Sequence, residues 1–362
     1  ATSIPGINIS GPGISPNVVN RLGLTKAGNG TLTLGAQNTF AGSTRLNDGT
    51  TVLAGGENTI YFPSTGAPLL GATGSSLNTG NLIVNSGATL DLNGNDQRVG
   101  GYASNFAAGS SALPGTGGVI TNTSATAATL RISQGANFTV ASSLGGNLNV
   151  QRDGGFTLTM TSPNTHTGAT VFNGGLTVLQ DGATLSNTSS ITLNRAALRL
   201  DDSQFVQTLN RIPATAPITL NGGALTFTGR GGGNQNVFSI GPVTVGTGAG
   251  LLQQTMAANS NANGAGASQV TVANLVRSGA GATVSFGIAQ SNAQPVGDNP
   301  RFYLSQLEGG ALPGPGVMLP AWITTIGHNP GSAAGGTSGT INNITANSID
   351  FAQYDPAVGL RA

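Results

Sequence analysis

The sequence contains no cysteine and very little charge. Only 7% of the 362 residues are charged, whereas an ordinary soluble domain carries about 25%. The 13 basic and 12 acidic residues leave a formal net charge of +1, which provides no field to attract nucleic acid or an anionic surface. We therefore expect no nucleic-acid partner and a surface built from hydroxyl and amide groups. The absence of cysteine fits an exported bacterial surface protein, and equally a protein that simply uses none.

Long apolar runs and helical periodicity are also missing. No stretch approaches the ~18 apolar residues of a membrane span, and no charged region followed by an apolar run marks an export signal near residue 1. We expect no direct membrane insertion by this chain, and an export signal that has been removed or lies outside it. Apolar residues never recur at the i, i+3, i+4, i+7 spacing of an amphipathic helix, so helix should be nearly absent.

What the chain does contain is a series of short β-type runs. Hydrophobic residues make up 38% of the sequence and are spread evenly, so a core can form and disorder is disfavoured. Residues 31–34, 51–53 and 82–84 alternate or cluster apolar residues, and Gly and Asn recur between such runs. Such runs predict strands of three to five residues separated by turns.

An internal repeat aligns without a gap. Residues 24–53 recur as residues 150–179, so that Thr157 stands 126 positions after Thr31. Shorter echoes of the repeat lie at 84–92, 193–200 and 220–227. A strand, a Gly/Asn turn and another strand, repeated at this length, wind into a coil whose strands stack in parallel.

The predicted fold is therefore all-β, a parallel β-helix (solenoid) with roughly 22 residues per rung. Inward aliphatic residues should form the core, and outward Thr and Asn ladders would explain the scarcity of charge. We expect three regions: an extended arm at 1–22, the β-helix at 23–295 and a capping or assembly region, irregular and β-rich, at 296–362.

The two long copies resemble the passenger-associated β-strand repeat of autotransporter-type bacterial surface proteins. Asn38-Thr39-Phe40 and Asn164-Thr165-His166 stand where that family usually has Asn-Thr-Tyr, followed by Thr-Gly. Phe40, His166 and Asp48 depart from the family pattern, and residues 317–322 and 350–355 look like segments of long members. The resemblance implies a right-handed β-helix exported to the cell surface.

Candidate catalytic groups are few. The adjacent pair Asp201-Asp202 follows Arg195 and Arg199, but successive strand residues point to opposite faces, so we favour a solvated turn over a catalytic pair. Asp91 and Asp96 occupy the related turn of the earlier copy.

Neither histidine offers a convincing catalytic role. His166 replaces Phe40 of the first copy, which favours a packed aromatic over a general base. His328 lies in a turn-rich segment, and no Gly-x-Ser-x-Gly elbow supplies a nucleophile.

Metal and nucleotide motifs are missing as well. Residues 231–234 lack the acid of a calcium repeat, and Ala27 after Lys26, the only lysine, excludes a phosphate-binding Gly-Lys-Ser/Thr loop. We predict no catalytic, cofactor-binding or metal-binding residues.

The two ends suggest assembly. An arm carrying Ile4, Ile7, Ile9 and Ile14 could cap its own β-helix or add a strand to a neighbouring copy. Contact residues expected near the C-terminus, in a capping core rather than a sugar-stacking platform, are Phe302, Tyr303, Trp322 and Tyr354. The function indicated is a non-enzymatic structural rod of the bacterial surface that self-associates into a fibre. A glycan-binding adhesin is the alternative, and a polysaccharide-degrading enzyme is less favoured.

Overall fold

The computed structural model describes residues 23–38, 42–60, 80–104, 116–230, 236–256, 268–289, 301–314, 317–326, 349–356 and 359–361. Every regular element in these residues is a β-strand, and the parallel β-helix predicted from the sequence is confirmed. The chain divides into two compact units, unit 1 (1–175 and 183–189) and unit 2 (176–182 and 190–362). The expected arm with its four isoleucines lies outside the described residues.

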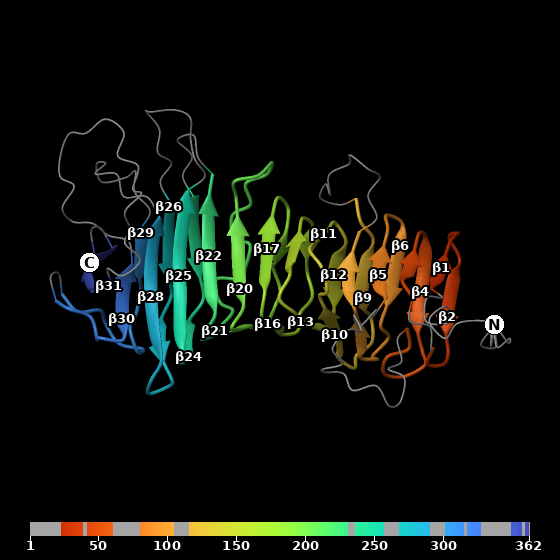
Figure 1. Cartoon of the computed structure of the whole chain (residues 1–362), viewed down its shortest axis with the longest axis horizontal. Coiled ribbons are helices and arrows are strands. Elements are labelled where there is room, and N and C mark those ends of the chain that lie inside the picture. The colour runs from red at the N-terminus through yellow and green to blue at the C-terminus, as the bar shows by residue number, and fades with distance from the viewer. Residues whose placement is uncertain are drawn as a thin grey trace, which may run out of the picture. The chain divides into compact units, whose positions relative to one another are not determined.

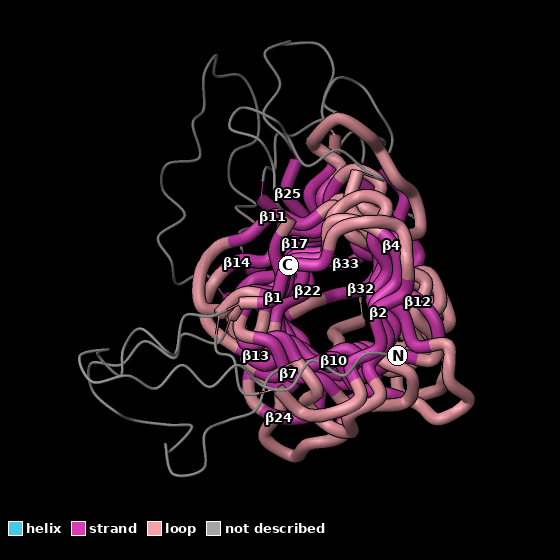
Figure 2. The backbone as a smooth tube through the Cα atoms, turned by 90° about the vertical axis from the view of Figure 1, so that its right-hand side faces the viewer, coloured by secondary structure: helices cyan, strands magenta, loops and turns pink. Residues whose placement is uncertain are grey.

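Within its described residues, unit 1 is built from five stacks of parallel strands. The first stack contains, in the order of pairing, β1 (Leu24–Lys26), β3 (Thr44–Leu46), β5 (Asn81–Val84) and β8 (Gly101–Ala103). The second contains β2 (Thr31–Leu34), β4 (Gly49–Leu53), β6 (Ala88–Asp91), β9 (Val119–Asn122) and β12 (Ser143–Gly146). The third stack contains β7 (Gln97–Val99), β10 (Ala128–Ser133), β13 (Leu148–Asp153) and β16 (Thr170–Asn173). The fourth contains β11 (Phe138–Val140) and β14 (Thr157–Met160), and the fifth contains β15 (Pro163–Asn164) and β18 (Thr184–Leu185). In Figure 2, β2, β4 and β12 overlie one another.

Unit 2 repeats this construction with longer strands, several of which lie side by side in Figure 1. Its main stack is β17 (Leu176–Gln180), β20 (Ala197–Asp201), β22 (Ala224–Gly229), β25 (Ala249–Met256), β28 (Thr283–Ala289), β30 (Ile323–Ile326), β31 (Ile349–Phe351). The others are β19 (Ile191–Asn194), β21 (Ile218–Asn221), β24 (Val243–Thr247), β27 (Leu275–Arg277); β23 (Asn236–Ile240), β26 (Ser268–Val272), β29 (Arg301–Leu304); and β32 (Gln353–Asp355), β33 (Gly359–Arg361).

The strand register shows how the core forms. In unit 2, Ile191, Ile218 and Val243 stack on one another and are buried. The threonines between the inward residues of β19, β21 and β24 form a half-buried outward column. Aliphatic residues thus face inward and hydroxyls outward, as the alternation predicts.

The length of a rung is not constant. In unit 1 Val150 pairs with Thr170, an advance of 20 residues, but in unit 2 Ile191 pairs with Ile218, an advance of 27. The predicted length of about 22 residues per rung therefore holds for the long repeat, but it is shorter than this rung of unit 2. The extra residues of this rung lie in the described loop 202–217, which inserts between β20 and β21 without disturbing their stacks.

Parallel stacking ends in the last strands of unit 2. β31 pairs with β30 in the antiparallel sense, and β32 and β33 form an antiparallel pair. The Tyr354 hydroxyl donates to the carbonyl oxygen of Leu304 at 3.0 Å. The reversed strand direction distinguishes these strands from the parallel stacks, and the Tyr354 hydrogen bond joins β32 to β29.

Candidate functional site

A basic residue at the third position of each long repeat copy is buried and bonds to backbone carbonyl groups. Lys26 Nζ donates to the carbonyl oxygens of Gly28 and Asp48, both at 2.6 Å. Arg152, at the equivalent position, donates to the carbonyl oxygens of Gly174 and Phe156. Both cations therefore fix turns rather than face solvent.

The asparagine of the Asn-Thr-aromatic motif joins three rungs. Asn164 is fully buried; its Oδ1 accepts from the amide of Leu144 at 3.0 Å, and its Nδ2 donates to the carbonyl oxygens of Ser162 and Thr184, both at 3.0 Å. Asn38 makes the same kind of bonds to Ala36 and Thr59. The motif is thus a device for holding successive rungs together.

Asp201 and Asp202 are not in a solvated turn, which corrects the expectation from the sequence. Both are buried and engaged separately: Asp201 accepts from Ser203, while Asp202 Oδ1 accepts from Arg211 Nη2 at 2.6 Å and Nε at 2.9 Å. Burial raises the pKa of Asp202, opposed by the Arg211 charge. Both carboxyl groups are thus withdrawn from solvent, where a substrate would have to reach them.

A clamped loop carries the two most exposed large apolar side chains in the described part of unit 2, those of Phe205 and Leu209. Asp181 Oδ1 accepts from the amides of Phe205 (2.9 Å) and Val206 (3.2 Å), and Thr208 donates to the Asp181 carbonyl oxygen at 2.5 Å. Phe205, Val206 and Leu209 are 73%, 44% and 53% exposed. The loop therefore presents three apolar side chains to solvent while hydrogen bonds hold its backbone.

The other acidic and basic candidates are also structural. Asp91 accepts from the amide of Asn93 and from both the amide and hydroxyl of Thr123, and Asp96 accepts from the amide of Thr129 at 2.7 Å. Of the two arginines that precede Asp201, Arg195 is exposed and Arg199 half-buried. Within the described residues neither arginine bonds to Asp201 or Asp202, and Asp202 pairs with Arg211 instead.

His166 is fully buried in a chain of hydroxyl groups. Its Nε2 lies 2.8 Å from Thr170 Oγ1, which lies 2.8 Å from Thr188 Oγ1, and Thr188 donates to the Gly168 carbonyl oxygen. Each hydroxyl has one proton, so Thr170 donates to Thr188 and Nε2–H of His166 donates to Thr170.

The same arrangement explains why His166 stays neutral. Its Nδ1 is buried without a hydrogen-bond partner in the described structure, and burial lowers the pKa of His166 to about 4. A residue held neutral in this way is a packed aromatic rather than a base poised near neutral pH. His328 and residues 231–234 lie outside the described residues.

Three of the four expected C-terminal contact residues are buried. Phe302, Trp322 and Tyr354 are 0%, 8% and 5% exposed, and Tyr303 is half-buried. Phe302 packs on Phe286, with ring centroids 5.1 Å apart. Their ring faces lie in the packed end of unit 2 and are not presented to a sugar.

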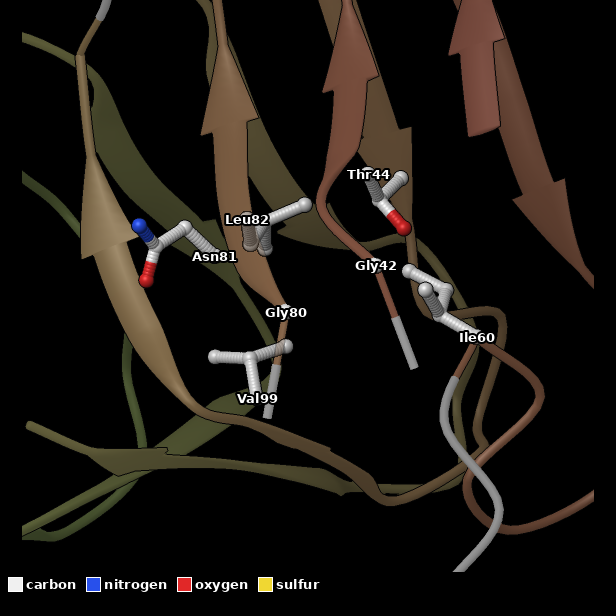
Figure 3. Close-up of a pocket in the computed structure, with 7 residues that line it drawn as sticks. All are labelled: Gly42, Thr44, Ile60, Gly80, Asn81, Leu82 and Val99. Carbon is white, nitrogen blue, oxygen red and sulfur yellow. The ribbon is translucent and has the colours of Figure 1, made fainter. Parts of the chain in front are cut away.

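A small pocket lies in unit 1 (Figure 3) between the ends of neighbouring rungs. Its lining residues are Gly42, Thr44, Ile60, Gly80, Asn81, Leu82 and Val99. Its volume of about 10 Å³ is room for about one water molecule and is far below the ~300–1,000 Å³ of typical ligand pockets. Thr44 corresponds to Thr170 of the second copy, and its buried Oγ1 has no partner in the described part of the chain.

Sequence reasoning missed two buried arginines. The alignment of Arg152 with Lys26 could have revealed the first, because both copies keep a cation there. Nothing in the sequence marks Arg211, nine residues after its partner Asp202. In the described residues no group of three or more His, Cys, Asp and Glu side chains could hold a metal ion.

The fold and these contacts define a parallel β-helix whose motif residues maintain its turns and rungs. The family model of the passenger-associated-transport-repeat matches residues 24–53 and 153–179. The chain thus carries two copies of an autotransporter passenger repeat, and the resemblance seen in the sequence is confirmed. This repeat indicates an exported, surface-exposed passenger domain. No curated protein and no solved structure matches the chain.

Proposed function

We propose that this chain is a non-enzymatic structural protein of the bacterial cell surface whose copies assemble end to end into an extracellular fibre. The structural role is supported by one observation: the polar side chains of the repeat donate hydrogen bonds to the protein's own backbone. Lys26, Arg152 and Asn164 all bond backbone groups of neighbouring turns. An enzyme of this shape would direct such groups at solvent, where a substrate could meet them. No helix in the described residues is long and apolar enough to cross a membrane.

Two features support assembly. β1 and β2 are the outermost strands of their sheets within the described residues, and an unpaired strand edge is a template for another strand. In unit 2 the antiparallel strands β31 to β33 cap the stack, so bare stacking of two ends is disfavoured. We therefore assign the link between copies to the N-terminal arm.

The test is negative-stain electron microscopy of the purified chain. Two variants accompany it: one lacks residues 1–20, and one keeps the arm length but carries Ile4→Asn, Ile7→Asn, Ile9→Asn and Ile14→Asn. Filaments in the parent chain that disappear in both variants support the proposal. Filaments that persist in both overturn the role of the arm, and isolated particles or closed pairs in all three samples overturn the fibre.

A surface adhesin is the second candidate, because of the clamped loop in unit 2. Phe205, Val206 and Leu209 project from a scaffold that holds their backbone through Asp181, and rigid exposed apolar groups are typical binding anchors. Binding of the parent chain to an array of surface glycans or to whole cells, lost in Phe205→Ser and retained in Gln204→Ala, would favour this function. Equal binding by both variants would exclude the loop as the adhesive site.

A further inference from the structure

Asparagine followed by glycine occurs at five places in the sequence. The pairs begin at Asn29, Asn93, Asn173, Asn221 and Asn263, and the last lies outside the described residues. In such a pair the backbone nitrogen of glycine can attack the carboxamide carbon of asparagine, since glycine has no side chain to obstruct the approach. The reaction requires that the asparagine side chain is free to turn toward that nitrogen.

Three of the four described pairs are held by hydrogen bonds. Asn173 Nδ2 donates to Asp153 Oδ1 at 2.7 Å, and Asn221 Nδ2 donates to Asn194 Oδ1 at 2.8 Å. In the third pair Asn93 Nδ2 donates to the Leu53 carbonyl oxygen at 3.2 Å, and the attacking nitrogen, that of Gly94, donates to an asparagine side chain. Each of these pairs must open locally before it can react.

Asn29 differs from the other three. Asn29 and Gly30 are both exposed, in the turn between β1 and β2. The Asn29 side chain makes no hydrogen bond to a described residue. The turn itself is fixed on both sides, because Lys26 Nζ donates to the Gly28 carbonyl oxygen and the Thr50 amide donates to that of Gly30. The backbone is thus held while the reacting side chain is free.

We propose that Asn29 is a site of spontaneous covalent modification, at which its amide becomes a carboxylic acid. The Gly30 nitrogen forms a bond to Asn29 Cγ and gives its proton to solvent. The side-chain nitrogen takes up a proton and leaves as ammonia, which closes a five-membered succinimide. Water then adds to one of the two ring carbonyls and opens the ring to aspartate or isoaspartate. One water is consumed and one ammonia released, and no oxidant or reductant is needed.

The product places a negative charge two residues before the edge strand β2, and isoaspartate also adds one atom to the backbone of the turn. Charge beside an exposed edge discourages pairing with another strand. This consequence rests on the proposed function: modification of Asn29 would weaken addition of a neighbouring copy at this edge.

Peptide mass spectrometry of the purified chain, incubated near neutral pH in heavy-oxygen water, tests the modification. Conversion to labelled acid should be roughly tenfold faster at Asn29 than at Asn93, Asn173 and Asn221, because each of those must first break a hydrogen bond. Equal or slower conversion at Asn29 overturns the proposal.

Two variants test the chemistry without disturbing the fold. A Cβ added at Gly30 would meet no atom within 4 Å, so Gly30→Ala should fold normally and convert several-fold more slowly by obstructing the attack. Asn194→Ala releases the Asn221 amide and should accelerate conversion there by roughly tenfold. An unchanged rate in Gly30→Ala overturns the succinimide route, and an unchanged rate in Asn194→Ala overturns the role of the hydrogen bonds.

Electron microscopy of Asn29→Asp beside the parent chain tests the consequence for assembly. Fewer or shorter filaments in Asn29→Asp support it, and an equal yield overturns it. Absence of filaments in the parent chain overturns the proposed function, while the mass spectra still decide whether Asn29 is modified. The two failures are therefore distinguishable.

Discussion

Lys26 and Arg152 hold the same backbone carbonyl group in two copies of the repeat. Lys26 Nζ donates to the carbonyl oxygen of Asp48 at 2.6 Å, and Arg152 Nη1 donates to that of Gly174 at 2.5 Å, each 22 residues further along the chain. The contact joins one rung to the next, since a rung of the long repeat advances by 20 residues. A buried cation thus replaces the side-chain ladder at this corner.

Arg152→Met should destabilise unit 1 by about 2 kcal/mol, because it leaves the part-buried carbonyl oxygens of Gly174 and Phe156 without this donor. Burial lowers the pKa of Arg152, so removal of the charge returns part of that cost. Arg152→Lys should lower the free energy of unfolding by less, since Lys26 donates to the equivalent carbonyl oxygen in the first copy. Urea unfolding followed by circular dichroism measures the free energy of unfolding of both variants. Equal decreases in the two variants would contradict the equivalence of the two copies.

Gly175→Ala should destabilise the chain by ~2 kcal/mol or more. Gly175 has a φ of 64°, which costs an L-residue about 1–2 kcal/mol. A Cβ there would also lie 2.3 Å from Arg152 Nη1 and 2.5 Å from the Gly154 carbonyl oxygen. Gly155→Ala is the matched control, because nothing lies within 4 Å of its added Cβ. Similar midpoints of thermal unfolding for the two variants would show that the turn relaxes freely.

The sequence predicted the parts of this protein that repeat and failed where a contact occurs once. Strand periodicity, the turns and the equivalence of Asn38 with Asn164 follow from the alignment, because stacked rungs give equivalent residues equivalent neighbours. The burial of Asp202 could not be predicted, since its partner Arg211 belongs to a loop with no counterpart in the repeat. Two adjacent acidic residues are predicted to be exposed to solvent unless a buried cation is known to pair with one of them.

Breaking the Asp202–Arg211 ion pair should be costly. Both side chains are 0% exposed, so Asp202→Asn or Arg211→Met alone should lower the free energy of unfolding by ~3–5 kcal/mol. The double variant Asp202→Asn/Arg211→Met should lower the free energy of unfolding by less than the sum of the two, since it leaves no unpaired charge. Gln204→Ala, an exposed position of the same loop, should change stability by no more than ~0.5 kcal/mol. Additive losses in the double variant would contradict a coupled pair.

The buried imidazole of His166 should make the chain less stable in mild acid. Its pKa is about 4 when folded, against 6.5 for the ordinary side chain, so the unfolded chain binds more protons between these values. The free energy of unfolding is therefore highest, as far as His166 is concerned, above pH ~6.5, and it falls as the pH decreases toward ~4. The total loss is up to ~3 kcal/mol, at 1.36 kcal/mol per pKa unit. The physical reason is Nδ1, which would carry an unpartnered proton in the core. His166→Phe, which installs the residue of the first copy at position 40, should remove this dependence. Urea unfolding at a series of pH values gives the difference between the two curves, and parallel curves would show that the pKa of His166 is the same in the folded and unfolded chains.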